Sequence, residues 1–200
     1  FNDSVAGLTD ILIYLSGEDV FPVIIGGSSA LITAVDKALS RLKIRYSLLA
    51  VDPRIDFINE KKEADSFNYL NTIVHNHKST FDHYINVGYQ TYMNDQQVIN
   101  RFLKKNSELV RIGDVRKAIY LTEPLFRDST VAVFDISAVR QSDAPGTVSP
   151  CPNGFYGEEI CLLARYSGIS DKLKIFGLFE VSPELDNRNQ TAGLAAQIIW

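Results

Sequence analysis

The sequence has little of what marks secreted, membrane or nucleic-acid-binding proteins. Its 200 residues include only two cysteines, Cys151 and Cys161, too few for a disulfide framework and without the paired spacing of a zinc site. No apolar run is long enough to span a bilayer, and no basic segment precedes an apolar one at the start. The net charge is −4 without a basic run, which argues against a binder of phosphate backbones. We therefore expect a cytoplasmic protein with reduced thiols that binds neither membrane nor nucleic acid.

Histidine is also scarce, and its placement excludes a serine hydrolase. Residues 26–30, GGSSA, follow a predicted strand as a nucleophile elbow does, but the elbow needs glycine at Ala30. A histidine must also follow the acid in that fold, and His75, His77 and His83 all precede Asp135. The histidines have no cysteine or carboxylate at a recognised metal-ligand spacing, so we interpret them as solvated. The glycines match no nucleotide-binding loop either.

Short continuous apolar segments alternate with amphipathic helical patterns along the chain. Strands are predicted at 21–25, 46–51, 84–88, 109–112, 131–134 and 174–179, with helical patterns before, between and after them. This order predicts an α/β fold, a three-layer αβα sandwich whose mainly parallel sheet is covered by helices on both faces. We expect one domain over residues 1–200, lacking terminal segments because Trp200 stands inside the predicted last helix. A polar loop is predicted at 59–66, and a helix over 115–121 that stops before Glu123-Pro124.

Carboxylates stand where two of these strands end. Asp52 and Asp56 follow the strand 46–51, and Asp135 ends the strand 131–134. Open parallel sheets place ligand sites just beyond the carboxyl ends of their strands. Three carboxylates about 5 Å apart repel by about 3 kcal/mol per pair at an effective dielectric near 20, so a positive group has to offset them. That group is either a hard divalent cation or the Arg54 guanidinium, unless the aspartates are only turn formers and caps.

At these residues the sequence resembles the arginase, agmatinase and formimidoylglutamase family, the manganese ureohydrolases. The family motifs are G-G-D-H-S at 26–30, D-A-H-x-D at 52–56, S-F-D-x-D-x-x-D-P at 133–141, A-P-G-T at 144–147, E-V-N-P at 180–183 and N-x-T-A at 189–192. Residues 86–90 and 153–159 look closest to the formimidoylglutamase-like branch of Bacteroidota. The resemblance implies an arginase-like fold and, for active members, hydrolysis of C–N bonds in linear amidines.

The resemblance also implies six metal ligands, two histidines and four aspartates around two manganese ions, and half of them are replaced. The vestigial ligands that remain are Asp52, Asp56 and Asp135; the replaced ones are Ser29 and Arg54 for the histidines and Ser137 for the fourth aspartate. A fixed positive charge at Arg54 opposes a dication directly, so we expect an Arg-Asp cluster held by ion pairs, with no metal and no other cofactor. Glu180 matches the family glutamate near the amidine end of the substrate. It would either bind a cationic ligand or pair with a pocket arginine.

Three functional hypotheses follow. The leading one is a pseudoenzyme, a catalytically degenerate ureohydrolase-fold protein that acts as a binding or assembly module for a protein partner or a small cationic ligand. The alternative is a hydrolase of a linear amidine such as N-formimidoylglutamate, with one divalent ion on Asp52, Asp56 and Asp135. Oxygen ligands alone favour magnesium, calcium or manganese, and manganese is the ion of the family. The third is a homo-oligomeric scaffold, since ureohydrolases commonly form trimers or hexamers. No catalytic residue is assigned in the leading hypothesis.

Overall fold

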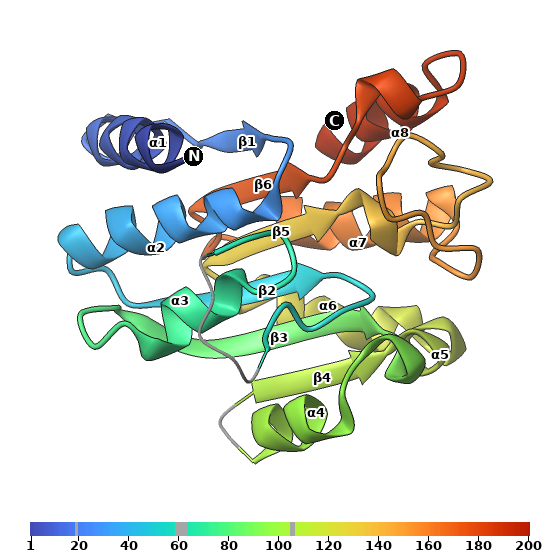
Figure 1. Ribbon diagram of the computed structural model, residues 1–200, viewed down its shortest axis with the longest axis horizontal. Coiled ribbons are helices and arrows are strands. Elements are labelled where there is room, and N and C mark those ends of the chain that lie inside the picture. The colour runs from blue at the N-terminus through green and yellow to red at the C-terminus, as the bar shows by residue number, and fades with distance from the viewer. Residues whose placement is uncertain (19, 59–63, 105–106) are drawn as a thin grey trace.

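A computed structural model describes residues 1–18, 20–58, 64–104 and 107–200, so part of the predicted loop at 59–66 lies outside the described residues. Within them, six strands form one sheet in the order β1-β6-β5-β2-β3-β4, and every pair is parallel (Figure 1). The strands are β1 Val23–Ile25, β2 Tyr46–Val51, β3 Phe81–Tyr89, β4 Ser107–Arg111, β5 Val131–Asp135 and β6 Ile175–Phe179.

Helices cover both faces of this sheet. They are α1 Asn2–Leu15, α2 Ile32–Arg41, α3 Tyr69–His75, α4 Gln96–Leu103, α5 Ile112–Lys117, α6 Glu123–Arg127, α7 Gly157–Gly168 and α8 Gln190–Ile199. Apolar side chains of α1 to α4 form one core cluster with the strands, and those of α5 to α8 form a second cluster. The predicted three-layer αβα sandwich is therefore confirmed.

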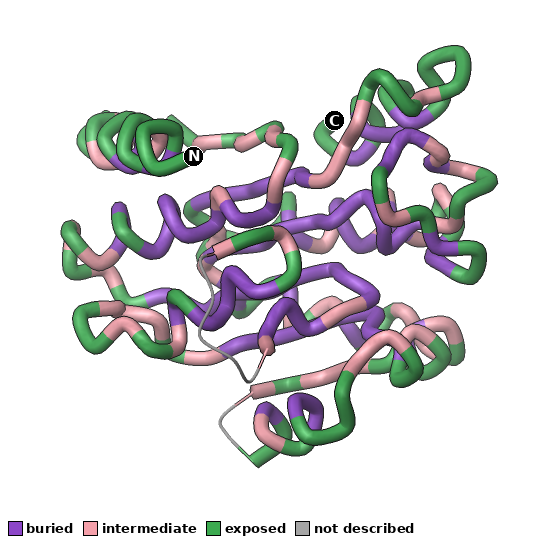
Figure 2. Tube along the Cα trace, in the orientation of Figure 1, coloured by how far each residue is buried: buried purple, intermediate pink, exposed green. Residues whose placement is uncertain are grey.

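The central strands are buried on both faces, as their continuous apolar sequences predict (Figure 2). Alternate residues of β2 point to opposite layers, with Leu48 in the cluster of α1 to α4 and Leu49 in the cluster of α5 to α8. Burying each such leucine contributes about 2 kcal/mol. This double burial fixes the register of β2 and β5, and therefore the place where their last residues emerge.

The prediction for residues 115–121 was wrong. The helix α5 begins at Ile112 and ends at Lys117, and Ala118 leaves helical geometry with φ −158° and ψ 67°. A 3₁₀ helix at Ile119–Thr122 follows, and α6 then begins at Glu123 with Pro124 in its first turn. Proline is tolerated there because the first helical N–H groups have no partner within the helix. The proline therefore starts a new helix instead of ending the previous one.

The two cysteines are free, with Cys151 buried and Cys161 half-buried. Among the described residues, no helix has the length and apolar character needed to cross a bilayer.

Candidate functional site

The sheet topology brings four loops together at one edge. Because all paired strands are parallel, the residues that follow β1, β6, β5 and β2 emerge side by side, about 4.8 Å apart from strand to strand. Asp135 is the last residue of β5, while Asp52 and Glu180 come directly after β2 and β6. The convergence predicted from the sequence is therefore present in the fold.

The three aspartates are almost completely enclosed. Asp52, Asp56 and Asp135 are only 3%, 2% and 8% exposed. Asp52 Oδ1 accepts the Arg54 N–H at 2.7 Å, and Asp135 Oδ1 accepts the Ser137 N–H at 2.6 Å. Asp56 Oδ2 is buried without accepting a hydrogen bond from any described residue, and the carboxyl group of Asp56 lies within hydrogen-bonding reach of Asp52. Two carboxyl groups bond to each other only by sharing a proton.

Burial raises the pKa of all three groups. Burial raises the pKa of Asp52 to about 6, although the hydrogen bonds from Asp56 and from the Arg54 backbone work against it. The pKa of Asp56 lies well above its usual range because of burial and then the nearby charge of Asp52, and the same two causes raise the pKa of Asp135. Burial therefore disfavours the charged form of all three carboxyl groups.

Arg54 does not form the ion pairs that we predicted. Its guanidinium carbon lies 4.7 Å from the ring centroid of Phe67, in a cation–π contact. Among the described residues, no ion pair within 4.0 Å joins Arg54 to an aspartate or to Glu180. Its charge still lowers the pKa of Asp52 and Asp56, but burial outweighs this effect. The arginine therefore acts on the carboxylates from a distance.

Glu180 also has a partner that the sequence did not indicate. Its Oε1 accepts the Ser29 N–H at 2.7 Å, and its own N–H donates to Gly27 O at 2.6 Å. The Glu180 backbone has φ +63°, in the left-handed region that non-glycine residues seldom adopt. The carboxylate of Glu180 thus binds the first residue of the 3₁₀ helix Ser29–Leu31, which leads into α2. The free N–H groups at the start of a helix favour an anion at this position. Glu180 remains partly exposed.

Ser29 and Ser137, the replaced ligand positions, are both buried. The Ser29 hydroxyl donates to the backbone oxygen of Ser66 at 3.1 Å, and the Ser137 backbone closes the turn onto Asp135. Both serines thus border the carboxylates, as the sequence predicts for this pocket.

Three polar residues that the sequence did not indicate as site residues lie close to the cluster: Tyr69, Tyr84 and Asn86. Asn86 Nδ2 donates to the backbone oxygen of Arg54 at 2.8 Å and to the Tyr84 hydroxyl at 3.2 Å. Burial, followed by the nearby charges, raises the pKa of both tyrosines well above the usual range. An asparagine in the apolar second half of the strand β3 was the available signal, since a buried amide needs hydrogen-bond partners.

The histidines lie away from this edge of the sheet. His75 and His77 are exposed at and after the end of α3, and His83 is near the beginning of β3, the end of that strand opposite to the carboxylates. His75 Nδ1 contacts the backbone oxygen of Asn71 at 2.8 Å. The interpretation of His75 and His77 as solvated residues is confirmed.

Little space remains among the carboxylates. A cavity of about 10 Å³ is lined by Ser29, Asp52, Tyr69, Asp135 and Phe179, among others. That volume accommodates about one water molecule. Within the described residues, no group of three or more His, Cys, Asp or Glu side chains has the arrangement of a metal site.

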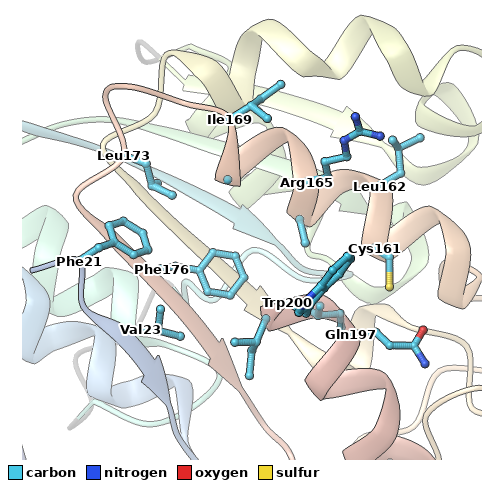
Figure 3. A pocket seen from close by; sticks show the side chains of 14 residues that line it. Phe21, Val23, Cys161, Leu162, Arg165, Ile169, Leu173, Phe176, Gln197 and Trp200 are labelled. Atoms are coloured by element: carbon cyan, nitrogen blue, oxygen red, sulfur yellow. The ribbon is translucent and has the colours of Figure 1, made fainter.

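A much larger hollow of about 720 Å³ lies beside the edge strand β1, between β6, α7 and α8. Figure 3 shows Phe21, Phe176 and Trp200 around it, with Arg165 and Gln197 among its few polar side chains. This hollow is separate from the carboxylates, since none of the three aspartates lines it.

Comparison with known proteins agrees with this architecture. Formimidoylglutamase of Bacillus subtilis is 24% identical over 191 residues, which cover 90% of this chain and 60% of that protein. The crystal structure of formimidoylglutamase from Bacillus subtilis superposes with a TM-score of 0.87 at 20% identity, covering 100% of this chain and 65% of that one. Trypanosoma cruzi formiminoglutamase, solved with Mn²⁺, superposes with a TM-score of 0.86 at 16% identity, covering 100% of this chain and 69% of that one.

This chain thus spans about three fifths of the length of the curated relative from Bacillus subtilis. The model of the Arginase family matches residues 6–200, which is nearly the whole sequence. The parallel sheet and the aspartates at its carboxyl edge lie within that match. The chain therefore belongs to the Arginase family.

Proposed function

We propose that this protein is a catalytically inactive member of the family, a binding or assembly module without the binuclear manganese centre. One observation carries the proposal. Ser29, Arg54 and Ser137 stand where the family motifs have three of six metal ligands, beside buried aspartates that leave a cavity of only about 10 Å³.

The donor set of this site does not fit two manganese ions. The cavity between Asp52 and Asp135 has a volume of about 10 Å³, which accommodates about one water molecule. No imidazole stands among the site residues, whereas the family motifs have two histidines, at the positions of Ser29 and Arg54. The fixed charge of Arg54 adds repulsion, so the remaining ligands support a metal-free state.

The partner of such a module would be a protein or a small cationic ligand. The partly exposed carboxylate of Glu180 supports a cation, since one of its oxygens is committed to Ser29 and the other has no hydrogen bond to a described residue. We further propose a homo-oligomeric, cytoplasmic protein. The free cysteines agree with a reducing compartment.

The first test is the manganese content of the protein after dialysis against manganese and then metal-free buffer. We expect far less than one ion per chain. A triple variant, Ser29→His, Arg54→His and Ser137→Asp, restores the replaced ligands and should bind manganese. The control makes the same changes at exposed positions, Ser4→His, Arg41→His and Ser142→Asp, and should bind none. Near-stoichiometric manganese in the unaltered protein would overturn the proposal.

A second candidate is a hydrolase of linear amidines with a reduced site. The convergence of Asp52, Asp56 and Asp135 at one strand edge favours it, since three oxygen ligands can hold one hard divalent ion. Such an enzyme would hydrolyse N-formimidoylglutamate only with manganese present, and Asp135→Asn would abolish that activity. Equal rates with and without manganese, or in the Asp135→Asn variant, would contradict this candidate.

A further inference from the structure

We propose that residues Asp65–Asn68 form a strap that is latched across the candidate site by Ser28, Ser29 and Arg54. The proposal deepens the proposed function and rests on it, because the strap is taken to regulate access to a pocket without metal ions. All three latch residues stand where this sequence departs from the family motifs. Positions that lost their motif residues would thus have gained contacts with the strap.

The latch consists of three contacts with two neighbouring strap residues. The hydroxyls of Ser28 and Ser66 lie 2.9 Å apart, and the Ser29 hydroxyl donates to the backbone oxygen of Ser66 at 3.1 Å. The Arg54 guanidinium stacks on Phe67 with 4.7 Å between its central carbon and the ring centroid. The cation–π contact explains why the arginine is not ion-paired with the aspartates: its guanidinium is engaged by the strap instead.

The topology places these contacts on both sides of the site. Ser28 and Ser29 follow β1, and Arg54 follows β2. The strands β6 and β5 lie between β1 and β2 in the sheet, and they carry Glu180 and Asp135 at their ends. A segment that contacts the loops after β1 and after β2 therefore spans the strand ends at which these carboxylates emerge.

The strap has its own internal order and a fixed far end. The Phe67 N–H donates to Asp65 Oδ1 at 2.8 Å, and the Asp65 N–H donates to Asn68 Oδ1 at 2.9 Å. Tyr69 begins α3 directly after the strap, and the Leu70 N–H donates to the backbone oxygen of Asp56 at 3.1 Å. The chain directly after the strap is thus hydrogen-bonded to Asp56, in the loop after β2. The strap itself contacts Ser28 and Ser29, in the loop after β1, through the side chains of these serines. Side-chain contacts are the part that can open without unfolding α3.

The latch can be tested by crosslinking. The double variant Ser28→Cys/Ser66→Cys should form an intramolecular disulfide under oxidised glutathione, because a disulfide joins sulfurs about 2.05 Å apart and the two hydroxyls are already adjacent. The control Ser28→Cys/Ser79→Cys should form none, because Ser79 bonds Asp36 further along α2. Peptide mapping under non-reducing conditions separates these bonds from any involving Cys151 or Cys161. Absence of the Ser28–Ser66 crosslink in a folded variant would overturn the strap.

A second measurement uses one introduced cysteine and no disulfide, with peptide mapping to separate its label from any on Cys151 or Cys161. We expect Phe67→Ala to raise the labelling rate of the Ser66→Cys thiol by at least fivefold, because it removes the Arg54 contact. Phe67→Tyr, which keeps an aromatic face, should leave that rate within twofold of the parent. Equal rates for the alanine and tyrosine variants would overturn the latch even if the double cysteine variant did not fold.

Manganese content of the same variants separates the two proposals. A crosslink that forms in a protein holding stoichiometric manganese would overturn the metal-free function and leave only the contact between Ser28 and Ser66. A missing crosslink in a protein without manganese would overturn the strap and keep the metal-free function.

Discussion

Replacing Asp52 with asparagine should stabilise the protein at alkaline pH, although the change alters a residue at the centre of the candidate site. Asp52 is 3% exposed, and burial raises the pKa of its carboxyl group from 3.8 to about 6. At pH 8 the carboxylate is therefore ionised in a place that disfavours its charge. Asparagine keeps an Oδ1 that can accept the Arg54 N–H and carries no charge.

The pKa change gives the magnitude. A rise from 3.8 to about 6 corresponds to about 3 kcal/mol, which is the stability that ionisation of Asp52 removes at pH 8. A carboxyl group with a raised folded pKa contributes stability below its unfolded pKa, and this contribution is lost as the pH rises through the folded pKa. The gain from Asp52→Asn should therefore be about 1–3 kcal/mol at pH 8 and below about 1 kcal/mol at pH 4.

Urea denaturation at pH 8 and pH 4, in the presence of a chelator, measures both values. Asp82→Asn is the matched control. A hydrogen bond from Arg45 lowers the pKa of this exposed carboxyl group, so its removal should give no stabilisation at pH 8. Destabilisation by Asp52→Asn at pH 8, or an equal gain at both pH values, would refute the reasoning. Destabilisation at pH 8 would indicate that a cation or another countercharge stabilises the ionised form of Asp52.

Two further predictions concern the scaffold around the site. Gly88→Ala should lower the free energy of unfolding by about 2–5 kcal/mol, because Gly88 has φ +106° and a Cβ there would collide with the Phe155 ring. Thermal unfolding measures this change. The control is Gly7→Ala, which should not destabilise α1 because a Cβ at Gly7 meets nothing within 4 Å. Asp36→Ala should cost about 3 kcal/mol in urea denaturation, because the buried carboxylate accepts the Tyr46 hydroxyl at 2.8 Å and Asn76 Nδ2 at 3.1 Å, whereas exposed Asp10→Ala should have little effect.

The elements that could be predicted are those whose own residues are apolar in a pattern that specifies their burial. The strand at 131–134 is continuously apolar, and the structure has β5 there with every residue buried. The prediction failed near Pro124 because a proline is compatible both with the end of one helix and with the first turn of the next. Which of the two occurs depends on how the chain packs beyond it.

For the site, the position of the aspartates at the ends of predicted parallel strands was enough to predict that Asp52, Asp56 and Asp135 converge. Their partners could not be predicted. Arg54 lies close to Asp52 and Asp56 in sequence, yet its guanidinium stacks on Phe67. Glu180 binds the backbone of Ser29, 151 residues away in the chain. A long side chain reaches several partners from one backbone position, so proximity in sequence does not decide its contact.

The sequence by itself determined the layers, the parallel sheet and the edge at which the aspartates gather, because apolar periodicity and chain connectivity specify which faces are buried and where strands end. The tertiary structure alone decided how enclosed the aspartates are and what surrounds them. Tyr69 and Tyr84 from other elements lie close beneath the carboxylates, and the cavity that remains is about 10 Å³. Desolvation depends on every neighbour in space, which is why the raised pKa of Asp52 follows from the fold and not from its place in a motif.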